Sequence, residues 1–163
     1  MTTMEKVNAI LRNEQYITCI SRIRELEENR IYCKHNMEHF MDVARIAYIM
    51  NLEHNLGIDK KIIYTTALLH DIGRQEQYEK NVAHEEAGAR IAREILKKCD
   101  FEEADILVII DAIALHGDSY MENEMNLNSL LYKADKLSRF CFSCHAKDTC
   151  NWDEAKKNMK IQL

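Results

Sequence analysis

The sequence contains no proline and only four glycines, at positions 57, 73, 88 and 117. A β-sandwich needs frequent tight turns, which these two residue types mostly supply, so the composition argues against such a fold. The chain also lacks any apolar run near the roughly 18–20 residues that span a bilayer. No long apolar core follows a basic segment in residues 1–13. We therefore expect a soluble, cytoplasmic protein without membrane partners.

An excess of basic charge is also absent. Lys and Arg total 22 against 27 Asp and Glu, the net charge is −5, and the basic residues are dispersed among acidic ones. Proteins that bind long nucleic acids present a basic stripe. A small phosphorylated ligand needs only a local group of cations and metal, because charges attract over about 10 Å at ordinary salt. We expect a small phosphorylated substrate, with a nucleotide favoured, and no long nucleic acid; an oligomer is compatible with this composition.

Apolar residues recur along the chain at the spacing of an α-helix. Hydrophobic residues make up 47% of the 163 residues, enough for one domain over 1–163. Val43, Ile46, Ala47 and Met50 form one apolar stripe. We predict an all-α fold, a single compact bundle of six to seven helices. The predicted helices cover residues 14–29, 36–52, 59–71, 84–98, 102–115 and 126–140, with a short last helix near 151–160.

Ionisable side chains occupy the apolar faces of these helices. They are His39, His70, Asp71, His84, His116 and Asp135. Because burying an unpaired charge is costly, such groups are normally paired or bound to a metal. Their nitrogen and oxygen donors suit iron(II), manganese or zinc. Taken singly, each histidine is more often an ordinary hydrogen-bonded residue, but the six together indicate a metal site. Gly73 is expected to stop the preceding helix, so that both His70 and Asp71 can reach one ion.

Three segments resemble the HD superfamily of metal-dependent phosphohydrolases. The similarity rests on His39 with Val43, the sequence Leu-Leu-His-Asp-Ile-Gly-Arg over 68–74, and Ala-Asp-Lys over 134–136. It spans about residues 31–140 and leaves a Cys-rich tail over 141–163. The resemblance implies an all-α core with four ligands for one divalent ion: His39, His70, Asp71 and Asp135.

Two further histidines resemble a subgroup of this superfamily that holds two ions and includes bacterial symmetrical diadenosine tetraphosphate hydrolases. His84 precedes Glu-Glu-Ala-Gly-Ala, and His116 follows Ala-Ile-Ala-Leu. The resemblance implies that both serve the second ion and that Asp71 bridges the pair. One or two divalent ions per chain are therefore expected, of undetermined identity. The branch that degrades cyclic di-GMP is set aside, because its Gly-Tyr-Pro element needs a proline.

The expected chemistry assigns roles to the surrounding cations. Metal coordination lowers the pKa of water toward neutrality and supplies hydroxide as nucleophile. Asp71 and Arg74 are the residues expected to act in catalysis, Arg74 by balancing charge on the phosphoryl group. The substrate contacts are expected from Arg74, Lys136, Arg139 and His35. For Arg74 the alternative is a solvated helix-end arginine, and for Lys136 and Arg139 it is surface ion pairing.

Two other functions use the same residues. A noncatalytic sensor would keep the scaffold and bind a metal or nucleotide without cleaving anything, although a pure scaffold has no physical need for every ligand. A metal-dependent oxygenase would place iron on an overlapping ligand set and consume oxygen with a polyol. The phosphohydrolase is our preferred hypothesis, and turnover distinguishes it from the sensor.

The cysteines form a separate signal. Without an export signal, the six are expected to be thiols or metal ligands rather than disulfides. Cys141, Cys144 and Cys150 follow the spacing C-x2-C-x5-C, and a pair two residues apart is the usual half of a zinc or iron–sulfur site. Cys33 or His145 could supply a fourth ligand; free thiols are the alternative. The C-x-x-C-H pattern of haem attachment is disfavoured, because it belongs to exported proteins.

Overall fold

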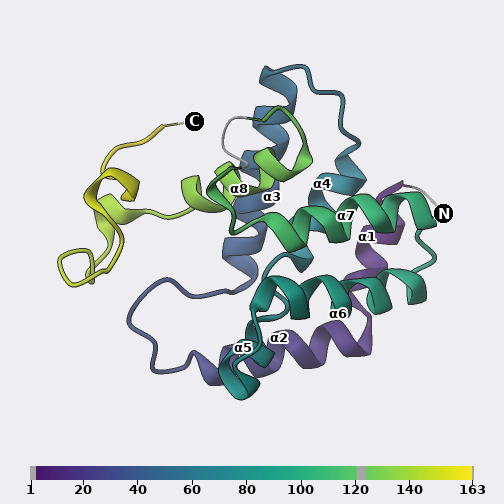
Figure 1. Ribbon diagram of the computed structural model, residues 1–163, viewed down its shortest axis with the longest axis horizontal. Coiled ribbons are helices and arrows are strands. Elements are labelled where there is room, and N and C mark those ends of the chain that lie inside the picture. The colour runs from purple at the N-terminus through teal and green to yellow at the C-terminus, as the bar shows by residue number, and fades with distance from the viewer. Residues whose placement is uncertain (1–2, 121–123, 163) are drawn as a thin grey trace.

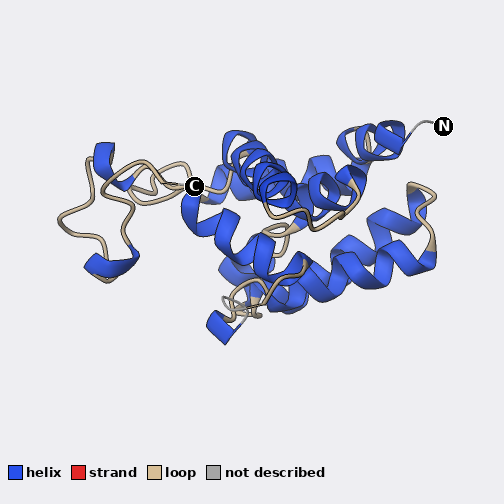
Figure 2. Cartoon of the chain, turned by 90° about the horizontal axis from the view of Figure 1, so that it is seen from above, coloured by secondary structure: helices blue, strands red, loops and turns tan. Residues whose placement is uncertain are grey.

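The computed structural model describes residues 3–120 and 124–162, which form helices and loops with no strand (Figures 1 and 2). The all-α class predicted from the sequence is therefore confirmed. The α-helices are α1 (Thr3–Leu11), α2 (Glu14–Leu26), α3 (Met37–Glu53), α4 (Lys60–Leu69), α5 (Arg74–Lys80), α6 (His84–Lys98), α7 (Glu103–Leu115) and α8 (Leu127–Leu137). Two single-turn 3₁₀ helices follow, η2 (Cys141–Ser143) and η3 (Glu154–Lys156).

One apolar core joins most of these helices. α3 packs against α4 and α8, and α6 packs against α7. The fully buried side chains include Ile63, Leu69, Ile95 and Ile109. Side-chain caps fix where helices begin: Asn36 accepts a hydrogen bond from the His39 backbone N–H at 3.0 Å, which satisfies a donor at the start of α3. Of the described helices, none has both the length and the apolar character to cross a membrane.

Two helices were not among those predicted, and one predicted helix is wrong. α1 and α5 are short, and α5 buries none of its residues, so it has no apolar stripe to reveal it. The predicted helix at 151–160 is reduced to η3. Its residue Asn158 instead donates hydrogen bonds to the carbonyl oxygens of Lys136 at 2.6 Å and Arg139 at 2.9 Å. The tail therefore caps the end of α8 through Asn158.

The turn between α4 and α5 contains a glycine for an unexpected reason. α4 ends at Leu69, slightly before the predicted end at residue 71, and Gly73 has a φ of −77°, so it does not adopt the left-handed conformation of a glycine helix stop. A Cβ atom built on Gly73 would lie 2.1 Å from the His84 carbonyl oxygen and 2.5 Å from the Gly88 backbone nitrogen. Glycine is needed because α6 passes directly against this turn. The expected role of Gly73 as a conformational stop is thus wrong.

The tail lies to one side of the helical body, opposite the N-terminal end (Figures 1 and 2). It contacts the loop over residues 27–36 between α2 and α3. The Tyr32 hydroxyl donates to the Thr149 carbonyl oxygen at 3.1 Å, and Arg139 donates to the Lys34 carbonyl oxygen at 2.9 Å. Loop and tail therefore form one wall beside the ends of α3 and α8.

Candidate metal centre

The six ionisable residues singled out in the sequence converge on one point of the helical body. Five are buried, and the Asp135 side chain is 13% exposed. They come from the first turn of α3, the end of α4 and the turn after it, the start of α6, the end of α7, and the last turns of α8. Each therefore lies at or near a helix end, where side chains from several helices can meet. The residues are His39, His70, Asp71, His84, His116 and Asp135.

Four of them form the first donor group, whose ligand atoms all lie within 4.8 Å of one another. The Asp71 Oδ2 atom is 2.9 Å from His70 Nε2 and 3.5 Å from His39 Nε2. The Asp135 Oδ1 atom is 3.3 Å from His39 Nε2 and 3.7 Å from His70 Nε2. Two nitrogens and two carboxylates thus face one another, as the resemblance implied.

The second donor group shares one member with the first. It consists of Asp71, His84 and His116, again with ligand atoms within 4.8 Å. The Asp71 Oδ1 atom is 3.6 Å from His84 Nε2 and 3.7 Å from His116 Nε2, and the two ring nitrogens are 3.2 Å apart. Asp71 therefore directs Oδ2 toward the first group and Oδ1 toward the second.

Backbone and side-chain partners orient the rings. The Nδ1 atoms of His70 and His116 lie 2.7 Å and 2.6 Å from the carbonyl oxygens of Ala67 and Ile113. Because a carbonyl only accepts, both Nδ1 atoms carry a hydrogen, and Nε2 is the ring nitrogen that faces the centre. The Ser138 hydroxyl lies 3.1 Å from His39 Nδ1. Three imidazoles are thus held in the orientation that a metal ligand needs.

The pKa values of three residues in the first group depart strongly from their ordinary values. Burial would lower the pKa of His70, but the neighbouring carboxylates of Asp71 and Asp135 raise it to about 10. Burial would raise the pKa of Asp71, yet His70 beside it holds that pKa well below its usual range, and the neighbouring His39 and His70 do the same for Asp135. Two anionic carboxylates, one buried and one 13% exposed, thus attract a positive charge into this space.

Two observations test whether a divalent cation fits. His70 Nε2 is buried and has no hydrogen-bond partner among the described residues, although two carboxylates lie close to it. Burial, and then the charge of Arg74, lower the pKa of His84 to about 3. A neutral imidazole is the form that binds metal. An unpartnered nitrogen, two carboxylates and a neutral histidine are a donor set that fits such an ion.

A pocket of about 520 Å³ opens beside the centre. It is lined by all four residues expected to contact substrate, namely His35, Arg74, Lys136 and Arg139, together with Asp135. Arg74 donates from Nε to Asp71 Oδ1 at 2.9 Å, and Lys136 donates to Asp135 Oδ2 at 2.7 Å. Arg139 places a guanidinium nitrogen 3.2 Å from His39 Nε2. Each expected cation therefore contacts a residue of the two donor groups.

The pocket also contains residues that sequence reasoning missed. Arg30 adds a fourth cation, and Tyr32 and Trp152 add aromatic rings. Outside the pocket, Glu27 contacts His35 through both carboxylate oxygens and accepts a hydrogen bond from the Tyr78 hydroxyl at 2.6 Å. Glu27 stands in a run of charged residues, so only its burial, at 3% exposure, distinguishes it from Glu28 beside it.

The chain is similar to several known proteins. It is 48% identical over 158 residues to an uncharacterized protein of Clostridium beijerinckii, covering 97% of this chain and 99% of the relative. It is 31% identical over 107 residues to ribonuclease Y of Lactobacillus gasseri and 33% identical over 108 residues to ribonuclease Y of Thermus thermophilus. Those alignments cover 66% of this chain but only 18% and 17% of the two relatives, so the chain spans less than a fifth of their length.

A solved structure shares the fold. It is the crystal structure of a predicted HD superfamily hydrolase from an uncultured Thermotogales bacterium, with a TM-score of 0.60, 22% sequence identity, and coverage of 88% of this chain and 81% of that chain. The HD domain family model matches residues 36–139, which contain all six converging residues. By this match the chain belongs to the HD domain family of metal-dependent hydrolases.

Proposed function

We propose that this protein is a phosphohydrolase with two divalent ions per chain, acting on a nucleotide or another small phosphorylated metabolite. The observation that carries the proposal is the division of the Asp71 carboxylate between the two donor groups. A carboxylate that offers one oxygen to each of two neighbouring groups is suited to bridge two cations. His39, His70 and Asp135 would hold one ion, and His84 and His116 the other.

The bound ions would supply a deprotonated water as nucleophile and polarise the phosphoryl oxygens. The chain's own residues supply the rest. Arg74 can present its planar guanidinium to two phosphate oxygens, and Lys136 and Arg139 can neutralise neighbouring phosphate charge. Asp71 and Arg74 are therefore the catalytic residues that we assign in this chain. Arg74 contacts Asp71 in this structure, so one side chain connects the donor groups to the pocket.

The contact between His35 and Glu27 suits His35 to donate or hold a proton. Its Nδ1 is 2.5 Å from Glu27 Oε1, and its Nε2 points toward the centre at 3.9 Å from Asp71 Oδ2. Because Glu27 fixes the ring, Nε2 can donate to a phosphate oxygen or hold a proton next to the leaving group. We assign His35 as a substrate contact on this basis.

The shape of the pocket supports a small substrate. Its four cations, Arg30, Arg74, Lys136 and Arg139, surround a volume of about 520 Å³. Drug-sized ligands occupy pockets of roughly 300–1,000 Å³. Trp152 and Tyr32 on the same wall offer ring faces on which a nucleobase can stack. A nucleotide with two or more phosphates, such as diadenosine tetraphosphate, combines both features. The ribonuclease Y relatives add a short RNA as a second candidate substrate for the same pocket.

The proposal is tested by metal content and turnover. Protein purified anaerobically is analysed for iron, manganese and zinc, and then incubated with nucleotides, diadenosine tetraphosphate and a short RNA. His84→Ala should lose one ion per chain and most of its activity. His54→Ala is the matched control, because His54 is exposed at the end of α3.

Each outcome decides between functions. Release of phosphate or nucleotide that depends on added metal and fails in Asp71→Asn supports the phosphohydrolase. Ligand binding without cleavage of any substrate, with iron(II) or manganese supplied, would instead support the metal or nucleotide sensor. Oxygen consumption with a polyol, in the absence of phosphate release, would support the oxygenase.

A further inference from the structure

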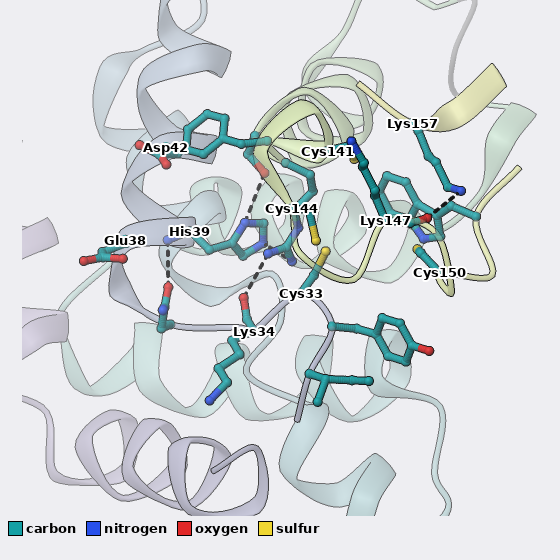
Figure 3. Close-up of a pocket in the computed structure, with 17 residues that line it drawn as sticks. Cys33, Lys34, Glu38, His39, Asp42, Cys141, Cys144, Lys147, Cys150 and Lys157 are labelled. Carbon is teal, nitrogen blue, oxygen red and sulfur yellow. Dashed lines mark hydrogen bonds between the residues drawn. The ribbon is translucent and has the colours of Figure 1, made fainter. Parts of the chain in front are cut away.

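Four of the six cysteines line one pocket, although they come from two segments that are far apart in the sequence (Figure 3). Cys33 lies in the loop between α2 and α3, and Cys141, Cys144 and Cys150 lie in the tail. The pocket has a volume of about 280 Å³. Cys19 and Cys99 are buried in the helical core instead. All six are free thiols, so the four in the pocket are available as ligands.

The pocket distinguishes the two candidates for the fourth ligand. Cys33 lines it together with the three tail cysteines. His145, the other residue that could complete the set by spacing, is exposed and does not line this pocket. The fold thus selects Cys33 as the fourth member.

We propose that Cys33, Cys141, Cys144 and Cys150 form a four-thiolate metal centre, separate from the histidine and aspartate centre. Two cysteines two residues apart, with two more supplied by distant segments, is the ligand pattern of zinc sites and iron–sulfur clusters. The pocket is also lined by several cations, which would balance the negative charge of four thiolates. These are Lys34, Arg139, Lys147 and Lys157.

The separation of the thiols bears on which metal they hold. Zinc binds sulfur at about 2.3 Å, so four sulfurs around one ion lie roughly 3.8 Å apart. Among the described residues, no three cysteine sulfurs lie within 4.8 Å of one another. An iron–sulfur cluster holds its cysteines farther apart, because several irons and sulfides stand between them. This wider arrangement around an open pocket favours a cluster over a single ion, and both share the same four thiolates.

The centre would fix one wall of the candidate active site. Cys33, Cys150 and Trp152 line both this pocket and the pocket beside the metal centre. Arg139, which contacts His39, also lines both. A metal that joins Cys33 to the tail would therefore hold Trp152 beside Lys136, whose ammonium lies 5.9 Å from the Trp152 ring. Loss of that metal would release the aromatic wall while leaving the helical core intact.

The experiment measures metal and acid-labile sulfide in the full chain, purified anaerobically. It compares wild type with His70→Ala, which removes a ligand of the other centre, and with Cys144→Ser and Cys150→Ser. Cys99→Ser is the matched control, because Cys99 is a free thiol at the end of α6, outside the pocket. Circular dichroism confirms that each variant keeps its helices. Trp152 is the chain's single tryptophan, so its fluorescence reports on the tail directly.

We expect His70→Ala to lose metal of the other centre only. The cysteine-bound metal, with any sulfide, should be retained in His70→Ala and Cys99→Ser but lost in Cys144→Ser and Cys150→Ser, with a change in Trp152 fluorescence. About four irons with about four sulfides per chain identify a cluster, and one zinc without sulfide identifies a single ion. Either result supports the four-thiolate centre. If the two tail cysteine variants are helical and contain as much metal and sulfide as wild type, the proposal is overturned. The two proposals fail in different ways. If the histidine and aspartate centre binds no metal, His70→Ala contains as much metal as wild type, whereas the tail cysteine variants still lose theirs.

Discussion

Glu27 and His35 form a buried pair at the edge of the candidate metal centre. The Glu27 Oε1 atom lies 2.5 Å from His35 Nδ1, and Oε2 accepts the His35 backbone N–H at 2.8 Å. One carboxylate therefore fixes both the backbone and the ring of the same residue. Since His35 is only 6% exposed, its Nε2 has little freedom except toward the pocket.

Replacing Glu27 should impair activity, because the ring of His35 is no longer held in place. In Glu27→Gln the ring of His35 loses its charged partner, and we expect kcat/KM to fall about 10- to 100-fold, the range found when the partner that orients a metal-site histidine is removed. Glu28→Gln is the control, because Glu28 is adjacent and exposed. Steady-state kinetics over a range of pH would measure the effect. Unchanged kcat/KM and an unchanged pH profile in Glu27→Gln would contradict a positioning role.

The same pair should make the fold sensitive to acid. Burial opposes ionisation of Glu27, but the hydrogen bond from His35 and its charge lower the Glu27 pKa from 4.5 to about 2. A lowered pKa in the folded state gives stability that is present above pH 4.5 and lost as the pH falls toward about 2. We expect a loss of at most about 3 kcal/mol from this group.

Urea unfolding at about pH 7 and about pH 3 measures this loss. Wild type should lose more unfolding free energy between the two values than Glu27→Gln, which carries no titrating group at this position. Burial also lowers the pKa of His35, which acts in the same direction. An equal loss in both proteins would show that Glu27 does not account for the acid sensitivity.

The sequence could predict the converging residues because apolar residues recur at helical spacing in most of the helices that carry them. His39 and Asp135 occupy apolar faces where a charge is conspicuous, and the motif over 68–74 is specific. Glu27 leaves no comparable signal, because it follows the last residue of α2 within a charged run. Its partner Tyr78 lies on α5, which has no buried residue. Contacts between such segments depend on tertiary packing, which periodicity does not encode.

The tail illustrates the same limit. The spacing of its cysteines predicted a possible metal site but left the fourth ligand open between Cys33 and His145. Only the packing of the tail against the loop distinguishes them, since it places Cys33 in the shared pocket and leaves His145 exposed. The predicted helix at 151–160 failed for a related reason, because Asn158 bonds to backbone at the end of α8.

Gly73 should not tolerate a methyl group. In Gly73→Ala the added Cβ would lie 2.1 Å from the His84 carbonyl oxygen, a backbone atom that cannot rotate away. α6 must then move, which we expect to cost about 3 kcal/mol of unfolding free energy and to displace His84 from the second donor group. Urea unfolding and metal analysis measure the two effects.

Gly57→Asn is the control for that substitution. Gly57 has a φ of +68° and no atom within 4 Å of a built Cβ, and asparagine accepts this conformation better than other residues. Its unfolding free energy should change by no more than about 1 kcal/mol, with metal content unaffected. If Gly73→Ala were as stable as Gly57→Asn and kept its metal, the close approach of α6 would not constrain the site.

We expect activity to depend on the planar guanidinium of Arg74. It donates to Asp71 Oδ1 and to Gln77 Oε1, each at 2.9 Å, and its side chain is 22% exposed at the pocket. Arg74→Ala removes the charge and should lower kcat/KM about 100-fold or more, the cost of losing one donor that stabilises developing charge. Arg74→Lys keeps the charge without the fork and should fall between Arg74→Ala and wild type. Arg90→Ala is the control, because Arg90 is 54% exposed and pairs with Glu76 on the surface.

Metal analysis of the same variants separates two explanations of such a loss. If Arg74 acts on substrate, Arg74→Ala should keep its metal ions and lose activity through both KM and kcat, since a phosphate bound more weakly is also positioned less well. If Arg74 serves only to hold Asp71, metal content should fall together with activity. Activity equal to wild type in Arg74→Ala would instead make Arg74 an ordinary arginine at a helix end, and would leave Lys136 and Arg139 as the cations that contact phosphate.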